Sequence, residues 1–145
     1  MKTQLLLEQL GTALGITLQP GEAGTCRLHF DQDEVDFEQT ADGLYIMADV
    51  GSAEGRQDAW GRLLRANCLG AESGGACLSL DDKRGMFMLH TVIDTDASYP
   101  NFEKALTRFV QALRYWKEWL ALGPAADKAA APQEALPPDV YMLRV

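Results

Sequence analysis

Apolar residues recur every three or four positions in three stretches of the chain, which is the spacing of one face of an α-helix. The first predicted helix covers Lys2–Leu14, and its apolar stripe consists of Leu6, Leu7, Leu10, Ala13 and Leu14. The same spacing predicts helices over residues 54–68 and 101–122. Leu5 lies off the stripe of the first helix, so this large aliphatic side chain has no obvious place in the core.

Between the helices the pattern changes to an alternation of period two, which is typical of strands with one buried face. Two alternating segments flank a turn at residues 31–33, and further strands are predicted over 44–50, 76–80 and 86–93. The last two form a hairpin, because Gly85 in the turn between them can adopt the positive φ that such turns need. The segment 44–50 is apolar on both faces, so we expect both faces to be covered: Leu44, Ile46 and Ala48 on one, Tyr45 and Met47 on the other.

These elements predict one α+β domain over residues 1–122, in the order helix, three strands, helix, two strands, helix. We expect an antiparallel twisted sheet packed with the three helices. A chain of 145 residues that is 47% hydrophobic is large enough for one such core. Residues 123–145 begin as an Ala- and Pro-rich linker. They end in a strand-like segment, 140–145, which we expect to dock on the protein or on a partner subunit.

The charge balance limits the classes of partner. Twenty-one acidic and 13 basic side chains give a net charge of −8, the wrong sign for binding nucleic acid or an anionic membrane. The first apolar run, residues 5–7, is followed by Glu8 and Gln9 and is too short for a signal peptide or a membrane-spanning helix. We therefore expect a cytoplasmic protein with no nucleic-acid partner and no membrane insertion.

No set of residues has the spacing of a catalytic site. His29 and His90 lie in predicted strands, with no Ser, Cys or Asp at a catalytic spacing. The segment 71–75 lacks the first glycine of a nucleophile elbow and the Lys-Ser/Thr ending of a phosphate-binding loop. The pattern favours a binding protein over an enzyme.

The acidic and sulfur-containing residues do not have the spacing of a metal site. Asp31, Asp33, Asp36 and Glu38 lack the glycine and the final glutamate of a calcium-binding loop, so they are interpreted as a solvated strand face. The three cysteines, Cys26, Cys68 and Cys77, contain no C-x-x-C pair. We expect reduced, mostly buried thiols, no metal and no cofactor.

The middle of the chain resembles a known family. Residues 63–70 read Leu-Leu-Arg-Ala-Asn-Cys-Leu-Gly, and Gly74-Gly75 precede the short apolar strand. This combination is similar to the class I type III secretion chaperones, the Tir chaperone (CesT-like) family. Two further segments match it, Leu10-Gly11-x-x-Leu14-Gly15 and Phe109-x-x-x-Leu113-x-x-Trp116. The resemblance covers about residues 1–122.

The resemblance implies a small acidic homodimer in the bacterial cytoplasm that uses no ATP. It would bind the N-terminal segment of a secreted effector, keep it extended and deliver it for export, with a secretion regulator or the export ATPase as further candidate partners. One alternative is a regulatory protein of the same fold that sequesters an anti-activator. A small α+β hydrolase or isomerase is the third reading.

The resemblance also implies two sets of site residues. The dimer set comprises Trp60, Leu63, Leu64, Asn67, Ala76, Leu78 and Leu80. Asn67 on an apolar stripe is typical of a polar group that fixes register across a two-fold axis, although the same face could be core. The effector-binding set comprises Leu5, Leu28, Phe30, Val35, Phe37, Leu44 and Ile46. Because alternation turns one strand face inward, several of these belong to the core, and the sequence does not tell which sheet face meets the partner.

Overall fold

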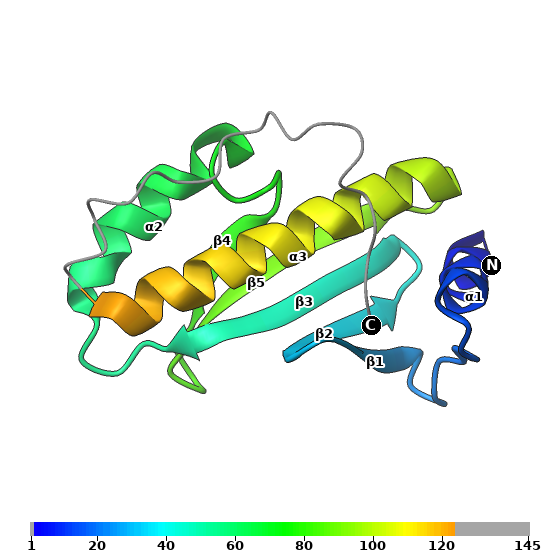
Figure 1. The fold of residues 1–145 in the computed structure, drawn as a ribbon, viewed down its shortest axis with the longest axis horizontal. Helices are drawn as coiled ribbons and strands as arrows, with labels where there is room; N and C mark the ends of the chain where they lie inside the picture. Colours follow the sequence, from blue (N-terminus) through cyan, green and yellow to red (C-terminus); the bar gives the residue numbers. More distant parts are fainter. Residues whose placement is uncertain (1, 124–145) are drawn as a thin grey trace.

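A computed structural model describes residues 2–123 and contains the predicted elements in the predicted order (Figure 1). The strands are β1 (Thr25–Phe30), β2 (Asp33–Gln39), β3 (Gly43–Ser52), β4 (Cys77–Asp81) and β5 (Met86–Asp94). The helices are α1 (Lys2–Leu14), α2 (Trp60–Asn67) and α3 (Tyr99–Leu122), and short 3₁₀ turns flank α2 at Gln57–Ala59 and Cys68–Gly70. The predicted linker and the segment 140–145 lie outside the described residues.

The five strands form one antiparallel sheet in the order β1-β2-β3-β5-β4. Helix α3 runs across one face of this sheet, α2 lies beside β4, and α1 lies at the opposite end of the sheet from α2 (Figure 1). The predicted α+β fold, with an antiparallel sheet and three helices, is therefore confirmed.

Helix α3 supplies the centre of the core. Its apolar stripe, with the helical spacing that predicts this helix, is buried along its whole length: Phe102, Leu106, Phe109, Val110, Leu113, Trp116 and Leu120. The helix begins earlier than predicted, because the Ser98 hydroxyl accepts a hydrogen bond from the Asn101 amide and Pro100 occupies the first turn. Serine at the N-cap and proline in the first turn are both favourable at a helix start.

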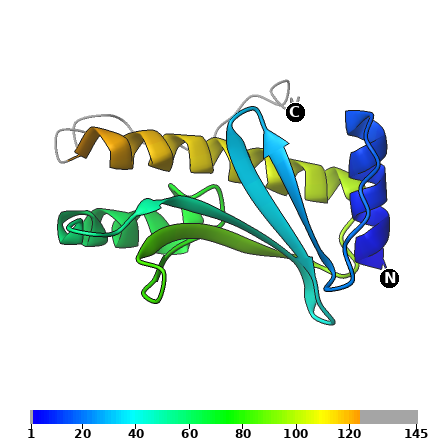
Figure 2. The same ribbon diagram turned by 90° about the horizontal axis from the view of Figure 1, so that it is seen from below.

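The sheet is covered on one face only within the described residues. Leu44, Ile46 and Ala48 of β3 are buried on the side of α3, whereas Tyr45 and Met47 point to the other face and stay partly exposed. Figure 2 shows α3 on one side of the sheet and no described helix on the opposite side. The expectation that both faces of this strand are covered is therefore wrong for the part of the chain described.

The turn before β4 is anchored to α3. The indole N–H of Trp116 donates to the Glu72 carbonyl over 2.8 Å, and the Arg62 guanidinium lies over the same indole ring and forms two hydrogen bonds to the Glu72 carboxylate. Gly74 has φ +64°, and a Cβ there would lie 2.7 Å from the Arg108 carbonyl oxygen. A glycine is therefore required where the turn meets α3.

Helix α1 has the predicted bounds but a slightly different buried face. Leu6, Leu7 and Leu10 are buried as expected, whereas Ala13 is exposed. Gly11 is buried instead, because the chain after the helix turns back and the Ile16 amide donates to the Gly11 carbonyl.

A buried carboxylate holds the β1–β2 hairpin against α3. Asp33 is only 7% exposed, and it accepts hydrogen bonds from Arg114 Nε over 2.7 Å and from Lys117 Nζ over 2.9 Å. Arg114 also bonds the Asp31 carboxylate and the Phe30 carbonyl. The interpretation of Asp33 as part of a solvated strand face is therefore wrong: its residue type fits a turn, but the fold brings α3 to it.

The ion pairs of Asp33 also determine its protonation. Burial by itself raises the pKa of a carboxyl group, but the hydrogen bonds from Arg114 and Lys117 outweigh burial and hold the pKa of Asp33 below its ordinary value. A carboxylate with a lowered pKa contributes stability above its unfolded-state pKa, and this contribution is lost as the pH falls through the folded-state value.

We predict that Asp33→Asn lowers the free energy of unfolding at pH 7 by about 2 kcal/mol, because two charge-assisted hydrogen bonds are weakened. The difference from wild type should shrink as the pH falls below about 3.9, the ordinary pKa of aspartate, because the unfolded wild-type chain then binds a proton that the folded carboxylate, with its lowered pKa, does not yet bind. Urea unfolding at pH 7 and pH 3.5 measures both effects. The matched control is Asp31→Asn at the exposed neighbour, and equal losses for both variants would contradict the central role of Asp33.

Candidate partner-binding surfaces

Apolar side chains remain exposed along α2 and β4. Trp60, Leu64 and Leu80 are exposed, and Leu64 is 69% exposed. Between them lies a groove of about 200 Å³ whose floor is formed by Leu63, Leu78 and Phe87. We call Trp60, Leu64, Leu80 and this groove the α2–β4 surface. Of the predicted dimer residues, Leu63 and Leu78 are buried and reached only through the floor of the groove, and the buried Ala76 does not line it.

Asn67 forms hydrogen bonds within the chain that its sequence position does not indicate. Its side-chain Nδ2 donates to the Leu78 carbonyl and its Oδ1 accepts from the Leu78 amide, both over 2.6 Å. These are the main-chain groups on the side of β4 that faces away from β5. Both polar atoms of the amide are therefore used within the chain, where they fix β4 against α2 and satisfy part of the outer sheet edge.

The residues of the predicted effector-binding set divide into two groups. Leu5 is 54% exposed on α1, as its position off the apolar stripe indicates, and Ile16 just after the helix is also exposed. The six strand residues all lie in the core: Leu28, Phe30, Val35, Phe37, Leu44 and Ile46. Their side chains therefore offer no surface to a partner in this fold, and Leu5 alone of the set is accessible.

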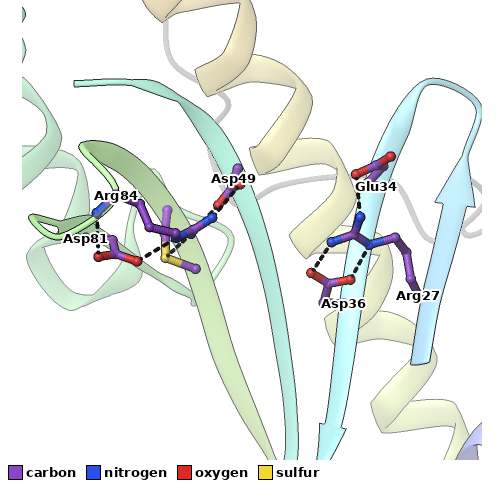
Figure 3. Close-up of polar contacts among 7 residues, drawn as sticks. Arg27, Glu34, Asp36, Asp49, Asp81 and Arg84 are labelled. Atoms are coloured by element: carbon purple, nitrogen blue, oxygen red, sulfur yellow. Dashed lines mark hydrogen bonds and ion pairs between the residues drawn. The ribbon is translucent and has the colours of Figure 1, made fainter. Parts of the chain in front are cut away.

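The bare face of the sheet carries two networks of ion pairs, drawn in Figure 3. Arg27 on β1 forms two hydrogen bonds to Asp36 and an ion pair with Glu34, both on β2. Arg84 joins Asp81 to Asp49 of β3, with a shortest separation of 2.7 Å in each ion pair. A cavity of about 260 Å³ lies between β2 and β3, and its lining includes Arg27, Asp36 and Asp49.

The histidines do not assemble a catalytic site with the side chains described. His29 lies on an exposed strand face, with its Nε2 3.1 Å from Glu34 Oε1. His90 lies on β5, paired with Met47 on one side and Cys77 on the other. The buried Ser73 hydroxyl is bonded to the Ala76 carbonyl, which is a structural contact within the turn.

The cysteines are more exposed than expected. Cys68 and Cys77 are exposed and Cys26 is partly buried, so the prediction of mostly buried thiols is wrong for two of the three. Burial, together with the nearby Asp36 carboxylate, raises the pKa of the Cys26 thiol. Cys77 alternates outward on a strand at the sheet edge, and Cys68 follows the end of α2, which explains their accessibility.

One exposed residue has no signal in the hydrophobic pattern. Leu69 is 99% exposed and adopts φ +55°, a left-handed conformation that is costly for a leucine. It lies in the segment that resembles the family motif, immediately after α2. Periodicity does not mark it, because it lies in a turn and not on a helix face.

Residues 2–123 contain no group of three or more His, Cys, Asp or Glu side chains that could hold a metal ion. Among the helices described, none has the length and apolar character needed to cross a membrane.

Comparison with known proteins identifies related chains. Residues 5–117 match the Tir chaperone protein (CesT) family. No curated protein matches the chain in sequence. Several solved structures have the same fold, with identities that support no more than the fold itself.

The fold is similar to a chain of the HopA1-SchA chaperone-effector complex, with a TM-score of 0.68, 20% identity, and coverage of 81% of this chain and 94% of that chain. A chain of the ExsC-ExsE complex is similar with a TM-score of 0.69 and 22% identity, and the match covers 81% of this chain and 92% of that chain. The Yersinia pestis type III secretion chaperone SycH, solved with a fragment of YscM2, is similar with a TM-score of 0.63 and 22% identity. The match covers 79% of this chain and 98% of that chain.

The family match extends over well more than half of the chain, and the structural matches cover nearly all of the related chains. The resemblance noted in the sequence is thereby confirmed. The chain belongs to the Tir chaperone protein (CesT) family.

Proposed function

We propose that this protein is a cytoplasmic type III secretion chaperone that acts as a homodimer without catalysis and holds the N-terminal segment of a secreted effector. The observation that carries the proposal is the presence of exposed apolar side chains at two separate places on a small acidic protein. Exposed apolar patches on such a protein mark surfaces for other chains. The net charge of −8 keeps a protein with such patches in solution.

The α2–β4 surface fits a second copy of the chain. Trp60, Leu64 and Leu80 border a groove with an apolar floor, so a large side chain from a partner would be buried there. In a two-fold dimer the same patch is used by both subunits, and Leu64 of one subunit would enter the groove of the other. Asn67 supports this by holding β4 in place against α2.

The exposed part of α1 fits the client. Leu5 and α1 lie at the end of the sheet away from α2, so a dimer formed through the α2–β4 surface leaves them free (Figure 1). The client segment must be unfolded when free, because the sequence contains no nucleotide-binding motif with which the chaperone could unfold it. Its binding free energy then comes from apolar anchors, offset by the cost of ordering the segment.

The direct test of the function is purification of the protein from its native bacterium, followed by identification of the protein that copurifies. A secreted protein bound through its N-terminal segment is the expected result. A regulator of secretion genes would support the regulatory alternative. Turnover of a small molecule by the purified protein, lost in a His29→Gln, His90→Gln double variant that still folds, would contradict a purely binding role.

Leu64→Asp should dissociate the proposed dimer, because a carboxylate would be buried unpaired at the centre of the interface at a cost of several kcal/mol. Light scattering should give about twice 15.9 kDa for the wild type and about 15.9 kDa for the variant at micromolar concentration. Ile16→Asp is the matched control, since Ile16 is also an exposed apolar residue but follows α1 at the opposite end of the sheet from α2. A monomeric wild type, or a dimer unaffected by Leu64→Asp, would contradict this interface.

Leu5→Asp should weaken binding of the copurified client at least tenfold, about 1.4 kcal/mol, while the melting temperature changes little. The reason is that Leu5 is exposed on α1 and contributes little to the core. Calorimetric titration with the N-terminal segment of that client measures the affinity. Gln9→Asp on the same helix is the control, and equal affinities for both variants and wild type would place the client anchor elsewhere.

A further inference from the structure

The sheet is divided between β2 and β3. These two strands pair from Gln39↔Leu44 to Asp36↔Met47, and the ladder ends there, although β2 begins at Asp33 and β3 continues to Ser52. Beyond this point the β1–β2 hairpin bends toward α3, while β3 stays with β5 (Figure 2). The 260 Å³ cavity lies in the resulting split.

Two features hold the split open. The Asp33 carboxylate ties the hairpin to Arg114 and Lys117 of α3, which draws β2 out of the plane of the other strands. On the opposite side, β3 has a register shift between Asp49 and Gly51 in its pairing with β5. Such bulges bend a strand and increase its twist. Both strands that border the split, β2 and β3, therefore contribute to its opening.

Main-chain polar groups point into the split from both walls. The Thr40 amide bonds the Gly43 carbonyl across the β2–β3 turn, which sets the alternation of the ladder. By this alternation the N–H and C=O groups of Glu34 on β2 and of Asp49 on β3 point toward each other. Both residues lie beyond the last paired residues, so the two strands exchange no ladder bonds there.

The chemistry of the opening is that of a sheet edge. Within residues 2–123 these groups have no ladder partner, and unpaired main-chain groups on a strand recognise the main chain of another extended segment. The side chains on the rim are held back from these groups, because Arg27 is engaged with Glu34 and Asp36, and Asp49 is engaged with Arg84 (Figure 3). Lys117 of α3 contributes to the lining of the cavity, so the opening reaches the helix beneath the sheet.

We propose that the split between β2 and β3 is a strand-insertion site, in which an extended segment of the secreted client pairs through its main chain with Glu34 and Asp49. This inference rests on the proposed chaperone function and adds a second point of contact to Leu5. The proposed site lies inside the sheet and is separate from its two outer edges, β1 and β4. The occupant is recognised by its backbone, so clients of different sequence fit.

Hydrogen exchange of the dimer tests the site directly. In the free protein the Glu34 and Asp49 amides should exchange faster than those of Asp36 and Met47, which close the ladder. Addition of the client fragment that survives proteolysis of the copurified complex should slow exchange at Glu34 and Asp49 at least tenfold. Binding of this fragment with no new protection at these two amides would overturn the proposal and leave the chaperone function standing.

Proline variants give an independent measurement. Asp49→Pro and Glu34→Pro each remove one N–H that points into the split, and neither removes a bond to β5 or β1. Each should weaken fragment binding at least tenfold, whereas Asp49→Asn and Glu34→Gln, which keep the N–H, should stay within threefold of wild type. The two substitutions are on different strands, β2 and β3, so either variant alone tests the site if the other variant does not fold.

Two other results would also be decisive. If the amide variants lose as much affinity as the proline variants, side-chain charge and not main-chain pairing determines binding, and strand insertion is wrong. If the wild-type protein binds no fragment at all, the proposed chaperone function fails and this inference fails with it.

Discussion

The buried stripe of α3 packs against one face of a five-stranded sheet, and the other elements of residues 2–123 are arranged around this contact. Phe102, Phe109 and Trp116 are fully buried in it. Because a sheet of this size has two faces and two edges, coverage by one long helix leaves the second face and the edges to be used or protected in other ways. In this protein they are protected by ion pairs or left as apolar surface.

Polar contacts decide where the remaining elements sit relative to that core. Asp33 ties the β1–β2 hairpin to α3, Glu72 joins the turn after α2 to Trp116, and Asn67 holds β4 beside α2. Each links residues far apart in the chain or on different elements, and each satisfies a group that would otherwise be buried unpaired. The consequence is that these contacts define where the hairpin, the turn and β4 lie relative to the core.

Those open surfaces lie at different ends of the molecule. The α2–β4 surface is at one end and Leu5 on α1 is at the other, with the split in the sheet between them (Figure 1). The proposed dimer contact and the proposed client contacts can therefore be occupied at the same time. Spread contacts also let an unfolded segment bind without a deep pocket.

Local sequence determined the elements and their order, because helix and strand periodicity, turn glycines and the exposure of Leu5 depend on neighbours a few residues away. The motif at residues 63–81, which indicated the family, is also a local feature of the sequence. Its Gly74 is required because a side chain there would clash with α3. Only the tertiary structure decided which strand face is inward, that Asp33 is buried, that Asn67 bonds Leu78 and that β2 parts from β3. These outcomes depend on which distant element packs against each residue, and alternation along one strand is the same whichever face is covered.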